Sequence, residues 1–135
     1  MTGVVLSWEA ELEELRRREA LAEQMGGEEK VARQHGRGKM DARARLTALC
    51  DDGTFREIGK IAGKGSYDED GNLQSVLPAP FLFGKARING RPVVATADDF
   101  TIRGGAADAG ISRKMVQAEK MAHELKLPII RMIDG

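Results

Sequence analysis

The sequence contains a single cysteine, few aromatic residues and no excess of charge of either sign. One cysteine excludes an intrachain disulfide, which is typical of a reducing compartment, so we expect a cytoplasmic protein. The 21 basic and 21 acidic residues balance, so the overall charge indicates neither a nucleic-acid nor an acidic membrane partner. No apolar run approaches the roughly 18 residues that a membrane-spanning helix needs. No group of histidine, cysteine and acidic residues has metal-ligand spacing, so we predict no metal site.

The length of 135 residues and the composition fit one soluble globular domain, and the order of the predicted helices and strands makes it α/β. Apolar residues make up 41% of the chain and charged residues 31%, as in globular proteins. Apolar spacing and glycine breaks predict helices over residues 7–25, 28–34 and 42–49, and Asp41 is the predicted N-cap of the last. We therefore place a soft boundary near residue 53, with a helical N-terminal arm over residues 1–53 and an α/β core over residues 54–135.

The last 55 residues carry the clearest structural pattern. Residues 81–88 and 92–97 flank Asn89-Gly90, the strongest short signal for a β-hairpin. A helix over residues 111–125 and a short strand over residues 129–133 follow, so we predict a right-handed crossover to a parallel strand. The chain ends at the carboxyl edge of that strand, where ligands bind in open α/β sheets. The polar segment 63–75 is predicted to be an exposed loop.

Basic residues gather in the arm. Six of them lie between Lys30 and Arg45, against the single acid Asp41. Within this segment His35-Gly36-Arg37-Gly38-Lys39 combines two cations with backbone N–H groups that glycine leaves unhindered, and phosphate recognition needs both. A solvated basic loop is the simpler alternative.

The pair Gly104-Gly105 is the second candidate. It follows a strand and precedes a helix that we expect to start near residues 107–109, so its backbone N–H groups could bind an anion or polarise a carbonyl. A plain turn is the alternative. Asp98 and Asp99 are adjacent in a strand and point to opposite faces, so we interpret them as structural rather than as an acid–base pair. These residues together indicate an α/β domain with an anion-binding loop.

The chain resembles the carboxyltransferase (β) subunits of biotin-dependent acyl-CoA carboxylases, of the propionyl-CoA carboxylase β-chain type. The arm segments that carry the resemblance are Gly26–Lys30, Gln34–Leu46 and Asp52–Phe55. The core motifs are Gly84, Ile88–Val94, Asp99–Thr101, Gly104-Gly105, Lys114, Pro128–Ile130 and Asp134-Gly135. Their order and spacing follow the family from about Ser7 onward.

This resemblance implies a crotonase-like (ClpP-type) ββα core behind the helical arm, here truncated. It implies transfer of carboxylate from carboxybiotin to the α carbon of a short acyl-CoA such as propionyl-CoA or acetyl-CoA, with glycine N–H groups stabilising the enolate. Arg37, Lys39 and Arg43 become candidates for contact with CoA. Gly104, Gly105 and Ala106 would line the acyl-CoA side. Gly135 would begin the catalytic oxyanion turn.

The resemblance also implies partners: an acyl-CoA thioester, carboxybiotin carried by a biotin carboxylase or carrier subunit or domain, and further copies of the chain in a homo-oligomer. It implies no metal, nucleic acid or membrane. We expect these 135 residues alone to be inactive, because the oxyanion turn and the biotin-side domain would be missing. Two alternatives stay open: a biotin-dependent acyl-CoA decarboxylase subunit, and a non-catalytic acyl-CoA-binding or assembly module whose basic arm meets nucleic acid or a partner helix.

Overall fold

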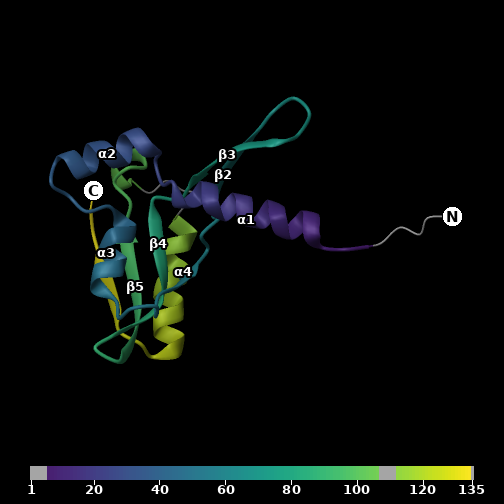
Figure 1. Cartoon of the computed structure of the whole chain (residues 1–135). Helices are drawn as coiled ribbons and strands as arrows, with labels where there is room; N and C mark the ends of the chain where they lie inside the picture. The colour runs from purple at the N-terminus through teal and green to yellow at the C-terminus, as the bar shows by residue number, and fades with distance from the viewer. Residues whose placement is uncertain (1–5, 107–111, 135) are drawn as a thin grey trace.

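A four-stranded mixed sheet forms the centre of the molecule (Figure 1). The computed structural model describes residues 6–106 and 112–134. The sheet order is β1-β4-β5-β6, and the strands are β1 (Arg56–Ile58), β4 (Phe81–Ile88), β5 (Arg91–Asp98) and β6 (Ile129–Met132). β1, β4 and β5 pair antiparallel, whereas β5 and β6 are parallel. The predicted parallel pair is therefore confirmed.

The turn between β4 and β5 follows the sequence prediction. Asn89 and Gly90 have φ of 50° and 78°, the left-handed pair that a tight two-residue hairpin needs. The Asp51 carboxylate accepts hydrogen bonds from both turn N–H groups, each at 2.8 Å. Asp51, at the end of the helical arm, thereby fixes the hairpin from outside the sheet.

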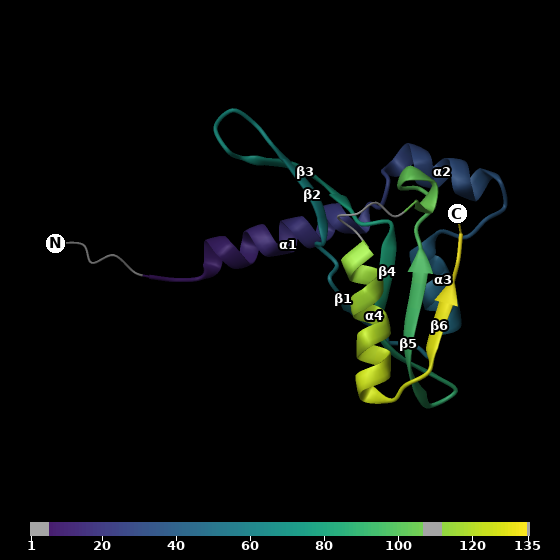
Figure 2. The same ribbon diagram turned by 180° about the vertical axis from the view of Figure 1, so that it is seen from behind.

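Two helices cover opposite faces of the sheet (Figure 2). Alternate residues of β4 and β5 point to each face, as the pleat requires. One face packs against α3 (Ala42–Leu49), and its buried residues are Ala42, Leu46, Cys50, Leu82, Ala86, Val93, Ala95 and Ala97. The other packs against α4 (Ser112–Leu125), through Phe81, Phe83, Val94, Ala118 and Ala122. Cys50 is thus a small residue of this core. α3 is part of this core, while the predicted boundary at residue 53 stays a prediction.

The N-terminal part projects from this three-layer core. α1 (Glu9–Glu23) packs on a separate two-stranded sheet of β2 (Gly63–Tyr67) and β3 (Leu73–Pro78), and Ala22, Leu73 and Val76 form a small cluster there. The prediction of a loop over residues 63–75 is therefore wrong. Every residue of β2 is exposed, so the strand lacks the apolar alternation that sequence analysis relies on.

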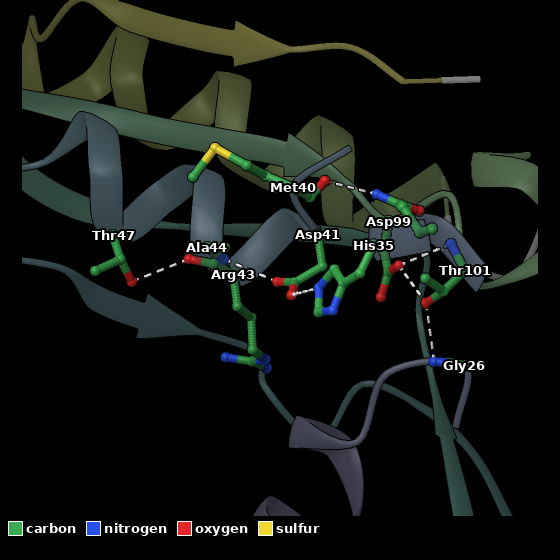
Figure 3. Close-up of polar contacts among 10 residues, drawn as sticks. Gly26, His35, Met40, Asp41, Arg43, Ala44, Thr47, Asp99 and Thr101 are labelled. Atoms are coloured by element: carbon green, nitrogen blue, oxygen red, sulfur yellow. Dashed lines mark hydrogen bonds and ion pairs between the residues drawn. The ribbon is translucent and has the colours of Figure 1, made fainter. Parts of the chain in front are cut away.

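The corner between α1 and α2 (Glu28–Gly36) contacts the loop after β5. The Gly26 N–H donates to Thr101 Oγ1 at 3.0 Å (Figure 3). A Cβ at Gly26 would overlap the Thr101 carbonyl group, so only glycine permits this approach. The contact holds α2 beside the loop that follows β5.

Asp41 is the N-cap of α3, as the sequence predicts. Its Oδ1 accepts the Ala44 N–H and its Oδ2 contacts His35 Nε2, both at 2.8 Å (Figure 3). Burial opposes ionisation of Asp41, but these two hydrogen bonds outweigh it and lower the pKa below its usual range. The cap therefore ties α2 to the start of α3 with a charged group.

Replacing Asp41 with alanine should lower the free energy of unfolding by about 1–2 kcal/mol, because the buried cap and the His35 contact are lost together. Urea unfolding measures the change. Asp52→Ala removes the same charge from an exposed position and should stay within about 0.5 kcal/mol of the parent. Equal effects of the two substitutions would contradict this role of Asp41.

Candidate functional site

A positively charged cleft of about 330 Å³ lies between α2 and the loop that follows β5. We call it the cationic cleft. Its lining residues are Lys30, Arg33, Gln34, Arg37, Lys39, Phe100, Thr101, Arg103 and Gly104. Five of the nine carry a positive charge and none is acidic. The cleft therefore unites the two candidate regions of the sequence, the basic loop of the arm and the Gly104-Gly105 loop.

The elements that line the cleft, α2 and the loop after β5, lie at the carboxyl edge of the parallel strands β5 and β6 (Figure 2). Lys39 Nζ is 3.7 Å from one Asp134 carboxylate oxygen, and Arg45 is 2.9 Å from the other. Asp134 lies two residues after β6, so these ion pairs place Lys39 and α3 beside the strand end. This is the edge that the sequence predicts for a ligand.

Lys39 is the cation that bridges the cleft and this edge. Its ammonium lies 5.4 Å from the centre of the Phe100 ring, within range of a cation–π interaction. Its side chain is 51% exposed and its distance to Asp134 is long for an ion pair. An exposed pair of this kind contributes little stability, so Lys39 can turn toward a ligand anion at small cost.

A buried hydrogen-bond network supports the loop after β5. Asp99 Oδ1 accepts from the Thr101 N–H at 2.9 Å and from its hydroxyl at 2.5 Å (Figure 3). Burial raises the pKa of Asp99 above its usual range. The neighbouring Asp98 instead accepts the Asp134 N–H at 3.2 Å. The two carboxylates have separate partners, which agrees with the structural interpretation of this pair.

The turn at Gly104 is formed by η1 (Arg103–Gly105), whose three residues all have positive φ of 49° to 76°. The Gly105 N–H donates to Ile102 O at 2.9 Å, and the Ala106 N–H donates to Arg103 O at 3.2 Å. Both groups thus close the turn in this conformation, while Gly104 lines the cleft. The predicted roles of Gly105 and Ala106 at the acyl group stay predictions. Gly135 and the helix start at residues 107–109 lie outside the described residues.

Arg43 occupies a different position from Arg37 and Lys39. It forms a bidentate ion pair with Glu57, with N–O distances of 2.7 and 3.1 Å, and its side chain lies away from the cleft wall. A bidentate pair between mostly buried groups is among the stronger interactions of its kind. Arg43 therefore joins α3 to β1, and its predicted contact with CoA stays a prediction.

Sequence reasoning gave no site role to six of the nine lining residues: Lys30, Arg33, Gln34, Phe100, Thr101 and Arg103. A signal for two of them was available, because Lys30, Arg33 and Arg37 are spaced i, i+3, i+7 along α2 and its C-cap, and so share one side. Phe100 and Arg103 enter the cleft only through the turn after β5. Their position depends on how that loop folds against the arm.

A second and larger pocket, of about 740 Å³, lies on the α4 side of the same loop. We call it the Lys114 groove. Its apolar lining residues are Ile58, Ala62, Leu77, Pro78, Ala79, Phe83 and Ile102. Lys114 also lines it and is only 9% exposed. Burial lowers the pKa of Lys114 to about 8, against 10.5 for an exposed lysine.

Replacing Lys114 with methionine should raise the free energy of unfolding at pH 7 by about 2–3 kcal/mol, since the lowered pKa measures the cost of burying the ammonium. This cost is fully present below pH 8 and disappears as the pH rises toward 10.5, because the unfolded chain then binds more protons than the folded one. The stability of the parent should therefore approach that of Lys114→Met between pH 8 and 10.5. Lys120→Met, at an exposed position, is the control. A variant no more stable than the parent at pH 7 would contradict this account.

Comparison with known proteins decides the family. The profile of the Carboxyl transferase domain family matches residues 33–135. The chain belongs to this family. It is 36% identical over 126 residues to the propionyl-CoA carboxylase beta chain of Roseobacter denitrificans, covering 92% of this chain and 24% of that one. It is also 36% identical over 111 residues to the methylmalonyl-CoA decarboxylase subunit alpha of Veillonella parvula, covering 82% of this chain and 22% of that one.

Solved structures support the same family assignment. A crystal structure of transcarboxylase 12S with methylmalonyl-coenzyme A and methylmalonic acid bound superposes with a TM-score of 0.81 at 31% identity, over 98% of this chain and 26% of that one. The predicted crotonase-like core with a helical N-terminal part is confirmed. The chain spans about a quarter of the length of the curated relatives it matches.

Residues 6–106 and 112–134 lack two further features. No helix in these ranges is long and apolar enough to cross a membrane. The same ranges contain no group of three or more histidine, cysteine or acidic side chains placed to hold a metal ion.

Proposed function

We propose that this chain is the acyl-CoA-binding part of a biotin-dependent acyl-CoA carboxyltransferase, which carboxylates the α carbon of a short acyl-CoA such as propionyl-CoA or acetyl-CoA. The observation that carries the proposal is the cationic cleft at the carboxyl edge of β5 and β6. Coenzyme A is a polyanion with an uncharged arm that ends in the reactive thioester. The cluster of cations matches the phosphates of coenzyme A, and the glycine turn beside it leaves room for the uncharged arm.

Each part of the cleft has its own role in this proposal. Arg37 and Lys39 hold the phosphates, and the α2 cations Lys30 and Arg33 add to the attraction. The pantetheine arm then runs past Gly104, which leaves room for close approach. The thioester reaches the strand ends, where backbone N–H groups can polarise its carbonyl and so acidify the α carbon. Carboxybiotin, held by a carrier subunit or domain, supplies the carboxylate that the α carbon accepts.

Two other assignments use the same cleft. The Veillonella relative is a methylmalonyl-CoA decarboxylase subunit, so a decarboxylase subunit is the nearest alternative. It differs in the direction of carboxylate transfer and not in how CoA is bound. A non-catalytic acyl-CoA-binding or assembly module is the other. In each case we expect further copies of this chain, and a biotin carboxylase or carrier partner for the two enzymes.

Calorimetric titration of the protein with CoA and with pantetheine tests the proposal. CoA should bind at least tenfold more tightly, because pantetheine lacks the phosphates that the cations recognise. Affinity for CoA should fall as salt rises, whereas that for pantetheine should not. Equal affinity for the two compounds would overturn the proposal. Retention of RNA with a steep salt dependence, and no CoA binding, would favour an assembly module on nucleic acid. We expect the 135-residue chain alone to show no biotin-dependent decarboxylation of malonyl-type thioesters.

A further inference from the structure

The Lys114 groove contains a buried cation that has no partner in the described structure. No hydrogen bond or ion pair joins the Lys114 ammonium to another residue in the ranges 6–106 and 112–134. The nearby Glu57 carboxylate is engaged on both oxygens by Arg43, at 2.7 and 3.1 Å. Glu57 therefore attracts Lys114 only over a distance. A buried charge without a partner is costly, and such groups are found at binding sites more often than elsewhere.

The backbone makes room for this lysine. Gly59 has φ of 71°, and a Cβ built there would lie 3.3 Å from Lys114 Cε, closer than most real contacts. The absence of a side chain at Gly59 thus lets the lysine stem pass between β1 and α4. Lys114 lines the groove, and the residue as a whole is only 9% exposed.

The rest of the groove is apolar with a positive margin. Ile58 and Leu77, both in its wall, are 37% and 38% exposed, high values for large aliphatic side chains. Among the described residues that line it, the charged ones are Lys64, Arg103, Arg113 and Lys114, all of them basic. A volume of about 740 Å³ lies in the range of small-molecule sites. The chemical complement of these walls is an anion at the end of an aliphatic chain.

We propose that the Lys114 groove binds a free aliphatic carboxylate, with its carboxylate paired to Lys114 and its chain packed against Ile58, Leu77 and Pro78. The site is distinct from the cationic cleft, although Arg103 lines both pockets. It lies on the α4 side of the loop after β5, whereas the cleft lies on the α2 side. The proposal goes beyond acyl-CoA binding and does not depend on it.

Calorimetric titration with decanoate tests this site. Decanoate should bind, and affinity should rise about threefold to fourfold for each methylene added between hexanoate and decanoate, as burial of the chain requires. Decanol, of the same length without the charge, should bind at least tenfold more weakly than decanoate. Saturating CoA should leave the decanoate affinity within about twofold, because the two pockets are separate.

Two substitutions separate the charge from the fold. Lys114→Met keeps the length of the side chain and should weaken decanoate binding at least tenfold, while decanol binding stays the same. Lys114→Arg keeps the charge and should retain decanoate affinity within about fivefold. Both variants should bind CoA like the parent, which shows that the cleft is intact. Absence of decanoate binding, equal binding of decanoate and decanol, or an unchanged affinity in Lys114→Met would each overturn the proposal. Failure of CoA binding alone would overturn the proposed function and not this site.

Discussion

Replacing Arg37 and Lys39 together with alanine should weaken CoA binding by about a hundredfold. Both residues line the cationic cleft, and none of its nine lining residues is acidic. A hydrogen bond to a charged group contributes about 1.5–3 kcal/mol, so the loss of two such contacts removes at least about 3 kcal/mol. The Lys39 change has a second effect. It removes a cation near Asp134, whose carboxylate then repels the phosphates more strongly.

The matched control removes the same two charges elsewhere. Arg17 in α1 and Lys120 in α4 are exposed and lie outside the cleft lining. Arg17→Ala with Lys120→Ala gives the same net charge, and it should change CoA affinity by less than about threefold, through long-range attraction only. Calorimetry at about 0.15 M salt compares the two double variants. Similar affinities in both would show that CoA responds to overall charge and not to the cleft.

Gly26→Ala should lower the free energy of unfolding by about 2–3 kcal/mol and weaken CoA binding more than tenfold. The added Cβ would overlap the Thr101 carbonyl group, so the corner between α1 and α2 must move away. This movement also breaks the 3.0 Å hydrogen bond from the Gly26 N–H to Thr101 Oγ1. The cations of α2 would then lose their fixed position opposite Gly104. Stability and binding should therefore fall together.

Gly36→Ala provides the comparison at the other end of α2. No atom lies within 4 Å of a Cβ built at Gly36, and the residue is helical. The substitution should leave stability unchanged or raise it by up to about 1 kcal/mol, since alanine favours the helix. CoA affinity should stay within about twofold. Urea unfolding and calorimetry measure both quantities. A Gly26→Ala protein that binds CoA as well as Gly36→Ala does would show that the arm need not dock on Thr101.

Local sequence signals predicted those elements whose conformation depends on near neighbours. The Asn89-Gly90 hairpin, the Asp41 cap and the helix before β6 each have a short pattern with a direct physical cause, and the structure confirms each one. The hairpin of β2 and β3 was missed because every residue of β2 is exposed, and the buried residues of β3 do not alternate strictly with exposed ones. Its stability comes from strand pairing and from α1, which lies about 50 residues earlier.

The candidate site was predictable in part for the same reason. The glycines and cations of residues 35–39 predict an anion-binding loop without any information from distant residues. That Arg43 would turn to Glu57, and that Arg103 would face the arm, depends on contacts between distant segments. Lys114 lies on an otherwise ordinary amphipathic helix, and only the three-dimensional packing beside Gly59 shows that this lysine is largely buried.

Hydrogen exchange followed by mass spectrometry, with and without CoA, tests the central claim most directly. If CoA binds in the cationic cleft, amides in residues 34–41 of the arm and 99–105 of the loop after β5 should exchange more slowly in its presence. The hairpin of β2 and β3, remote from the cleft lining, should not change. Protection of both cleft segments is the result that the structure predicts. Bound CoA that protects neither segment, or protects only the Lys114 groove, would contradict it.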